Sequence, residues 1–109
     1  MDYLKNLPIV CPEKLENLID IHPGRVVSMA LSREENCQMT VLAFGEGEGV
    51  SEEEYYGDTL YYVLDGEMSL TLSGQVHVLC AGYCMAVPAN VRHAIGGTKA
   101  FKLLQITLQ

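Results

Sequence analysis

Short stretches of strand-forming residues, separated by turn signals, fill the chain from Arg25 to its last residue. The clearest is Glu67–Leu72, where apolar and polar residues alternate between the turn dipeptides Asp65-Gly66 and Ser73-Gly74. Strands are expected at residues 25–31, 38–44, 60–64, 67–72, 75–80, 84–87 and 101–108. After residue 23 no helical stretch separates them, as a βαβ arrangement would require. The pattern predicts an all-β sandwich or barrel formed by one domain, residues 25–109.

Residues 1–24 are expected to form an N-terminal arm. Pro12 suits the first position of a helix, and acidic residues follow it. Apolar residues recur at three- and four-residue spacing from Leu15 to Ile19, and the dipeptide Pro23-Gly24 ends the pattern. A short N-terminal helix that packs on the outside of the barrel is therefore predicted.

The 109-residue chain is acidic, with a formal net charge of −7 and only seven Lys and Arg residues. It cannot neutralise a row of phosphates, which argues against nucleic acid and against an anionic membrane as partners. No apolar run approaches the roughly 20 residues needed to cross a bilayer. The first residues include charges and contain no long apolar stretch before a cleavage site, so a cytoplasmic protein is expected.

The four cysteines, Cys11, Cys37, Cys80 and Cys84, form no CxxC pair. In a reducing cytosol we expect them to be small, buried apolar residues. Cys80 and Cys84 bracket a predicted turn, which leaves a disulfide or a thiolate metal site open as the alternative.

The stretch from Gly49 to His93 resembles a cupin domain. The sequence YYVLDGE, Tyr61–Glu67, matches the end of the first cupin motif, and GYCMAVPANVRHA, Gly82–Ala94, matches the second. Within the second motif the first glycine, Pro88 and His93 fall at the family's spacing. The resemblance implies a double-stranded β-helix, the cupin or jelly-roll barrel.

The resemblance also implies a metal site, and this sequence matches that site only in part. The family holds a divalent metal with an HxH pair, a glutamate and a histidine of the second motif. His93 matches the last of these ligands, whereas Thr59 stands at the position of the glutamate. Two registers are open for the HxH pair: Glu52 with Glu54, or Glu53 with Tyr55.

Acidic residues cluster between Glu46 and Asp58, at the expected mouth of the barrel. Carboxylates this close repel one another unless a cation lies between them. A substituted site for Mn, Fe, Zn or Ni would use some of the following ligands: Glu52, Glu53, Glu54 and His93. The alternative is a solvated acidic loop, which is the commoner outcome for such a run.

Five residues are candidates to line a ligand pocket: Thr59, Tyr61, His77, Met85 and His93. Thr59 and Tyr61 share one face of a strand by its two-residue period, and the resemblance turns that face inward. His77 also points into the barrel if its neighbours Val76 and Val78 point outward. Met85 is otherwise a core residue.

Three functions remain open at this point. The first is a small-molecule-binding barrel, with or without a metal. The second is a metal-dependent cupin enzyme, of isomerase, decarboxylase or dioxygenase type, with carboxylates in place of histidines. The third is a structural module that assembles as a homodimer through the outer apolar face of Leu60, Tyr62 and Leu64 and the strand Phe101–Leu108. The sequence contains no glycine-flanked nucleophile or phosphate-binding loop.

Overall fold

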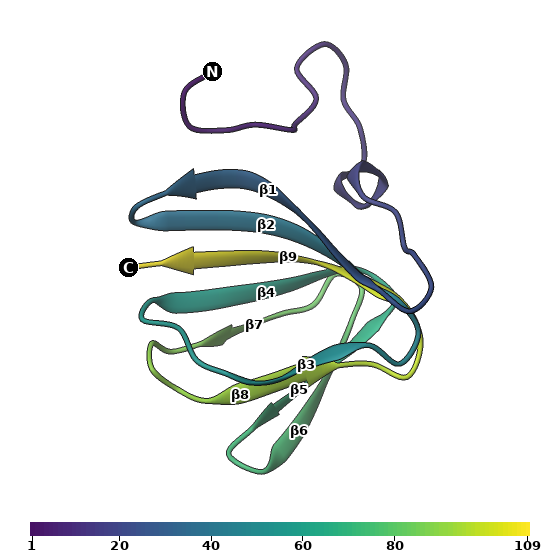
Figure 1. Ribbon diagram of the computed structural model, residues 1–109, viewed down its shortest axis with the longest axis vertical. Helices are drawn as coiled ribbons and strands as arrows, with labels where there is room; N and C mark the ends of the chain where they lie inside the picture. Colours follow the sequence, from purple (N-terminus) through teal and green to yellow (C-terminus); the bar gives the residue numbers. More distant parts are fainter.

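The computed structural model describes residues 1–109 as two antiparallel β-sheets that face each other (Figure 1). The strands are β1 (Val26–Glu34), β2 (Cys37–Phe44), β3 (Gly49–Glu53), β4 (Asp58–Asp65), β5 (Glu67–Leu72), β6 (Gln75–Cys80), β7 (Cys84–Val87), β8 (His93–Gly96) and β9 (Phe101–Leu108). One sheet has the order β1-β2-β9-β4-β7 and the other β3-β8-β5-β6. This confirms the all-β jelly-roll barrel predicted from the sequence. The structure has no helix long and apolar enough to span a bilayer.

The strand predictions are confirmed for β5, β6, β7 and β9, whose bounds match. Strand β4 starts earlier than expected, and β1 continues to Glu34, so that the turn before β2 shrinks to Glu35-Asn36. Strands β3 and β8 lie where no strand is predicted. The Gly and Glu residues of β3 have low strand propensity, but pairing with β8 holds them extended.

The turn between β4 and β5 depends on Gly66. Its φ is +79°, a backbone conformation that other residues rarely adopt. A Cβ added at this position would lie 2.6 Å from the carbonyl oxygen of Ala100. The predicted Asp65-Gly66 turn therefore requires glycine for both reasons.

The space between the two sheets is filled by the main apolar core. Its fully buried residues include the stacked pair Phe44 and Phe101, whose ring centroids lie 4.5 Å apart. The complete set of buried members is Phe44, Tyr61, Val63, Met68, Leu70, Leu79, Val87, Ile95, Phe101 and Leu103. Each large apolar side chain buried here stabilises the fold by about 1.5–3 kcal/mol.

A second apolar cluster forms on the outside of the five-stranded sheet, under the N-terminal arm. Ile19 of the arm packs there with Leu31, Val41 and Ala43. The partly buried residues around it are Leu7, Leu15, Ile21, Val27, Met29, Met39, Leu64 and Leu104. The arm therefore covers part of the outer face that the sequence predicts as a dimer surface, at Leu64 and Leu104.

The predicted N-terminal helix is present only as η1, a four-residue 3-10 helix at Leu15–Leu18. Its N-cap residue, Lys14, makes no side-chain capping bond. A helix this short has little stability of its own, so the arm depends on tertiary contacts. One of them is the Lys102 ammonium, which donates to the carbonyl oxygen of Glu16 at 2.7 Å.

Candidate functional site

The interior of the barrel is polar at one end and apolar at the other. Where β2, β9 and β4 pair, two rows of inward side chains are polar: Gln38, Thr107 and Thr59, then Thr40, Gln105 and Tyr61. The next two rows are apolar: Leu42, Leu103 and Val63, then Phe44 and Phe101. Because buried polar groups destabilise a core unless they are hydrogen-bonded, the polar end is the part of the interior suited to chemistry or recognition.

A buried hydrogen bond joins Tyr61 and His93 across the polar end. The Tyr61 hydroxyl lies 2.7 Å from Nε2 of His93, and both side chains are almost completely buried. Nδ1 of His93 lies 2.9 Å from the carbonyl oxygen of Val91. A carbonyl only accepts, so Nδ1 carries the proton of the neutral imidazole and Nε2 accepts from the Tyr61 hydroxyl.

A second hydrogen-bonded pair, Glu53 and Tyr55, lies beside the first. Glu53 stands directly opposite His93 in the ladder between β3 and β8. The Tyr55 hydroxyl donates to Oε1 of Glu53, and the Tyr55 ring centroid is 6.0 Å from that of His93. Burial, with the hydrogen bond to Glu53, raises the pKa of Tyr55 to about 12. Burial, followed by the nearby charge of Glu53, also raises the pKa of Tyr61. Both phenols therefore remain protonated donors at neutral pH.

An irregularity in β3 leaves one of the two candidate HxH pairs half-buried and the other exposed. The β3–β8 register shifts between Val50 and Glu53, and Glu52 adopts a φ of +48° there. Glu53 and Tyr55 are half-buried as a result, whereas Glu52 and Glu54 are exposed. A shift of one residue in strand register moves every side chain to the other face of the sheet. The sequence alone therefore does not show which of the two pairs faces inward.

Comparison with known proteins agrees with this fold. The cupin domain family matches residues 38–107, which is more than half of the chain. This chain is a cupin. A cupin superfamily protein from Desulfitobacterium hafniense DCB-2 is 47% identical, with 96% of each chain covered and a TM-score of 0.94. The comparison with curated proteins finds no match.

Two further solved structures resemble this cupin. A cupin 2 conserved barrel domain protein from Leptotrichia buccalis is 32% identical over 87% of this chain but only 46% of its own, with a TM-score of 0.84. A conserved protein of unknown function from Streptococcus pyogenes is 21% identical and shares the fold, with 100% of this chain and 96% of its own covered and a TM-score of 0.94.

The resemblance assigns the family's metal-ligand positions to Thr59, His93 and an HxH pair, for which Glu53 and Tyr55 are the half-buried candidates. The family has three histidines and one glutamate at these positions. The side chains of this cupin differ from that set and do not fit the metal that it holds. Only Glu53 and His93 are common ligand types, and the Nε2 lone pair of His93 accepts from Tyr61. The Thr59 hydroxyl is paired with the Thr107 hydroxyl at 3.0 Å. No group of three or more His, Cys, Asp or Glu side chains is arranged to hold a metal.

The candidate metal ligands are thus only partly brought together. Glu53 faces His93, whereas Glu52 forms an ion pair with Arg92 at the surface and Glu54 is exposed. Metal binding by Glu52, Glu53, Glu54 and His93 stays a prediction.

The five predicted pocket residues divide into two groups. Thr59, Tyr61 and His93 belong to the polar end, and Met85 lies opposite Tyr61 in the β4–β7 ladder. His77 is half-buried on β6 opposite Leu70, and β5 separates it from β8 and His93. His77 does not join the cluster.

Gln105 and Thr107 also belong to the polar end, and neither is among the pocket residues predicted from the sequence. The signal is present in the sequence of β9. Its alternate residues Phe101, Leu103, Gln105 and Thr107 share one face, and they change from apolar to polar along the strand.

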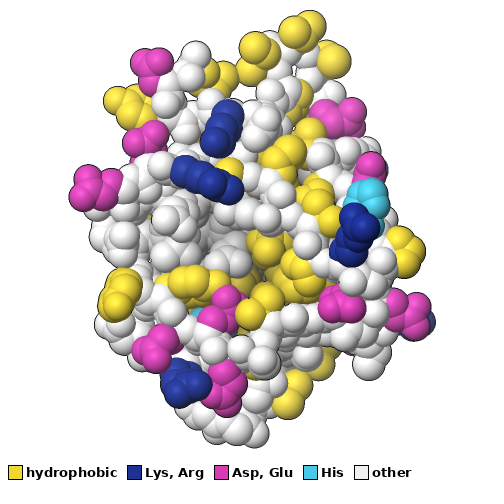
Figure 2. Space-filling view, viewed as in Figure 1, with side chains coloured by type: hydrophobic (Ala, Val, Ile, Leu, Met, Phe, Trp, Pro, Cys, Tyr) yellow, Lys and Arg dark blue, Asp and Glu magenta, His cyan; other side chains and the backbone are white.

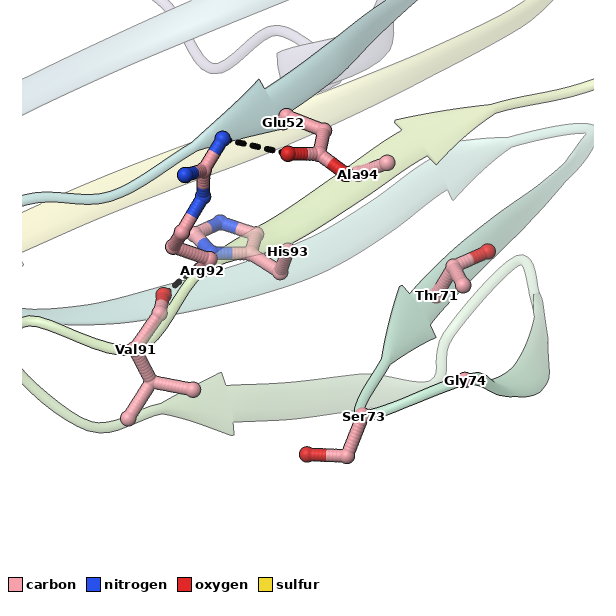
Figure 3. A pocket seen from close by; sticks show the side chains of 8 residues that line it. All are labelled: Glu52, Thr71, Ser73, Gly74, Val91, Arg92, His93 and Ala94. Carbon is pink, nitrogen blue, oxygen red and sulfur yellow. Dashed lines mark hydrogen bonds and ion pairs between the residues drawn. The ribbon is translucent and has the colours of Figure 1, made fainter.

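Two openings flank the polar end. A cavity of about 160 Å³ is lined by Glu35, Cys37, Gln38, Tyr55, Tyr56, Thr107 and Gln109. A wider groove of about 490 Å³ runs past the Glu52–Arg92 pair and the β5–β6 turn and touches His93 (Figure 3). Apolar side chains gather in the hollow between the sheets, whereas acidic side chains are spread around the outline of the molecule (Figure 2).

The cysteine prediction is wrong. Cys11, Cys80 and Cys84 are exposed, Cys37 is half-buried, and all four thiols are free. Cys80 and Cys84 end and begin short strands, where every second side chain points to solvent.

Proposed function

We propose that this cupin binds a small uncharged or cationic molecule in the polar end of its barrel, without a metal ion. The observation that carries the proposal is the buried Tyr61–His93 hydrogen bond, 2.7 Å long, at the end of an apolar core. Apolar side chains of similar volume would fill this space with less desolvation cost. A polar network held in such a place supports recognition of a ligand more than stability.

The size of the ligand follows from the cavity beside Tyr55. That cavity has a volume of about 160 Å³. Drug-sized and nucleotide ligands occupy pockets of about 300–1,000 Å³. A molecule of only a few non-hydrogen atoms fits the opening next to Tyr55 and Thr107.

The charge of the ligand follows from the groups around the same cavity. Its lining includes the carboxylate of Glu35 and no Lys or Arg. Glu53 adds a second carboxylate behind Tyr55. These charges repel anions and favour neutral or cationic molecules that donate hydrogen bonds.

A thermal-shift panel on EDTA-treated protein tests the proposal. The panel holds short polyols, amides and amines, with carboxylates of the same size for comparison. We expect a rise in the melting temperature with one or more of the first three classes and none with the carboxylates.

Two variants and a matched control locate the binding. Tyr55→Phe, in the wall of the cavity, is expected to weaken binding of the best compound by about 5- to 30-fold, the effect of losing one buried hydrogen bond. Tyr61→Phe, which releases the His93 ring behind that wall, is expected to weaken binding as well. Tyr83→Phe changes the same group at an exposed position and is expected to leave the affinity unchanged. A panel with no response, or a response that Tyr55→Phe and Tyr61→Phe do not change, contradicts the proposal.

The same panel, repeated with Mn, Fe, Zn and Ni salts, tests the metal-dependent enzyme as the competing function. That function predicts near-stoichiometric metal in the purified protein and loss of the metal in His93→Ala.

The cytoplasmic location expected from the sequence belongs to the proposal as well.

A further inference from the structure

The cavity beside Tyr55 is formed by three segments that lie far apart in the sequence. They are the turn between β1 and β2, the loop between β3 and β4, and the end of the chain after β9, which meet at the left of Figure 1. The amide of Gln109 donates to the carbonyl oxygen of Asn36 at 3.1 Å, and its side-chain Nε2 donates to the carbonyl oxygen of Glu35 at 3.0 Å. These two bonds hold the last residue against the turn and keep this wall of the cavity in place.

Tyr56 lines the same cavity, on a backbone that is held on both sides. The carbonyl oxygen of Tyr55 accepts from the amide of Asn90 at 2.7 Å, and the Asp58 carboxylate accepts from the amide of Ala89 at 2.9 Å. The Tyr56 side chain is nevertheless 88% exposed. Because a ring this exposed contributes little to the apolar core, it is available to contact a bound molecule.

The chemistry of the lining suits an organic cation. Its two aromatic side chains are those of Tyr55 and Tyr56, and its one charged residue is Glu35. The face of a tyrosine ring attracts ammonium groups that lie within about 6 Å of its centre. The Tyr55 hydroxyl donates to the carboxylate of Glu53, which polarises the phenol and makes its ring face more negative. The two rings and the carboxylate therefore attract the same kind of ligand.

An inorganic divalent cation suits this lining less well. Such ions require several oxygen ligands, commonly carboxylates, and the lining offers one carboxylate, that of Glu35. Glu53, behind the wall, already accepts from Tyr55. An ammonium ion that carries methyl groups needs fewer charged partners, because its methyl surface packs on aromatic rings.

We propose that the cavity binds a small organic ammonium ion, with the ring of Tyr56 against its methyl or methylene groups and Glu35 as the counter-ion. This ligand class rests on the proposed function and narrows it from neutral or cationic molecules to cations alone. Tyr56 is then the residue that determines specificity. A cavity of about 160 Å³ limits the ion to a few carbon atoms.

Titration of the full chain with trimethylammonium chloride, followed by ¹H–¹⁵N NMR of the backbone amides in phosphate buffer, tests the proposal. tert-Butanol is the matched neutral probe, because it has a similar size and also one hydrogen-bond donor. We expect trimethylammonium to bind at least about fivefold more tightly than tert-butanol. Added sodium chloride is expected to weaken binding of the ammonium ion and to leave that of tert-butanol unchanged.

Substitutions separate the ring face from the charge. Tyr56→Leu removes the ring but keeps an apolar side chain, and it is expected to weaken trimethylammonium binding by about 5- to 30-fold. Tyr56→Phe keeps the ring face and is expected to restore most of the affinity. Glu35→Gln is expected to reduce the dependence of binding on sodium chloride. Tyr83→Leu alters an exposed tyrosine outside the cavity and is expected to leave the affinity unchanged. The same spectra show whether each variant is folded.

Equal affinity for the two probes overturns the proposal, as does a loss in Tyr83→Leu as large as that in Tyr56→Leu. Failure of the proposed function is a different result, in which no compound of the thermal-shift panel binds. Binding of a polyol or an amide at the polar end, with no binding of trimethylammonium, overturns the ammonium class alone.

Discussion

The hydroxyl of Tyr61 lies 2.7 Å from Nε2 of His93, so the imidazole nitrogen that faces the barrel interior is already hydrogen-bonded to the protein. Nδ1 is bonded to the carbonyl oxygen of Val91 on the other side of the ring. The one histidine kept from the cupin ligand set is therefore fixed in orientation by two partners.

Removal of the Tyr61 hydroxyl should destabilise the fold. Tyr61→Phe keeps the ring but leaves Nε2 of His93 buried without a donor, which costs about 1–3 kcal/mol. Urea unfolding at neutral pH measures the change. Tyr83→Phe, at an exposed tyrosine, is expected to stay within about 0.5 kcal/mol of the native protein. Equal effects of the two substitutions would contradict the role of the buried bond.

The stacked rings of Phe44 and Phe101, at the apolar end, should contribute more to the free energy of unfolding than the Tyr61 hydroxyl does. Phe101→Ala removes a fully buried ring that packs on Phe44 and leaves a cavity, at a cost of about 3–5 kcal/mol. The free energy of unfolding in urea checks this value. Tyr3→Ala, in the exposed part of the arm, serves as the comparison and is expected to have little effect. A loss below about 1 kcal/mol would mean that the two sheets do not close over this pair.

Stability should fall at high pH because of Tyr55. Its pKa is raised from 10.0 to about 12 in the folded protein, so the folded state holds this proton more tightly than the unfolded state. The contribution is fully present below pH 10 and is lost as the pH rises through about 12. Urea midpoints measured across this interval should fall more steeply for the native protein than for Tyr55→Phe. Parallel curves for the two proteins would be inconsistent with the raised pKa.

Substitution of the residues at the family's metal-ligand positions tests whether their side-chain types prevent metal binding. The combined substitutions Glu53→His, Tyr55→His and Thr59→Glu restore the family's ligand types at the four positions, together with His93. This variant is expected to retain about one Zn per chain after dialysis, by elemental analysis, because a four-ligand site of this kind closes around the ion. The native protein is expected to retain none. Failure of the variant to gain Zn while it remains folded would show that ligand type is not what limits the site.

The sequence predicts the barrel well because alternation and turn dipeptides are local signals. The alternating residues Glu67–Leu72, between two glycine-containing turns, predict a strand, and the structure confirms it as β5. Strand β3 escapes prediction because its glycines and glutamates are extended only through pairing with β8. Non-local pairing of this kind leaves no mark on the local sequence.

The candidate site was predictable to a lesser degree. The inward positions of Thr59 and Tyr61 follow from the two-residue period of a strand. The choice of Glu53 and Tyr55 over Glu52 and Glu54 depends on one irregular residue in β3. The Tyr61–His93 bond joins residues 32 positions apart, and only the closed barrel brings them together.

We propose Tyr61 and His93 as a metal-free recognition pair, and long-range ¹H–¹⁵N NMR of the histidine rings observes this pair itself. EDTA-treated protein is compared before and after addition of the compound that gives the largest thermal shift, with His93→Gln used to assign the signals. We expect a neutral, Nδ1-protonated His93 ring whose Nε2 signal shifts when the compound binds. A ring that changes only when a divalent metal is added, or an Nε2-protonated ring in the free protein, would contradict it.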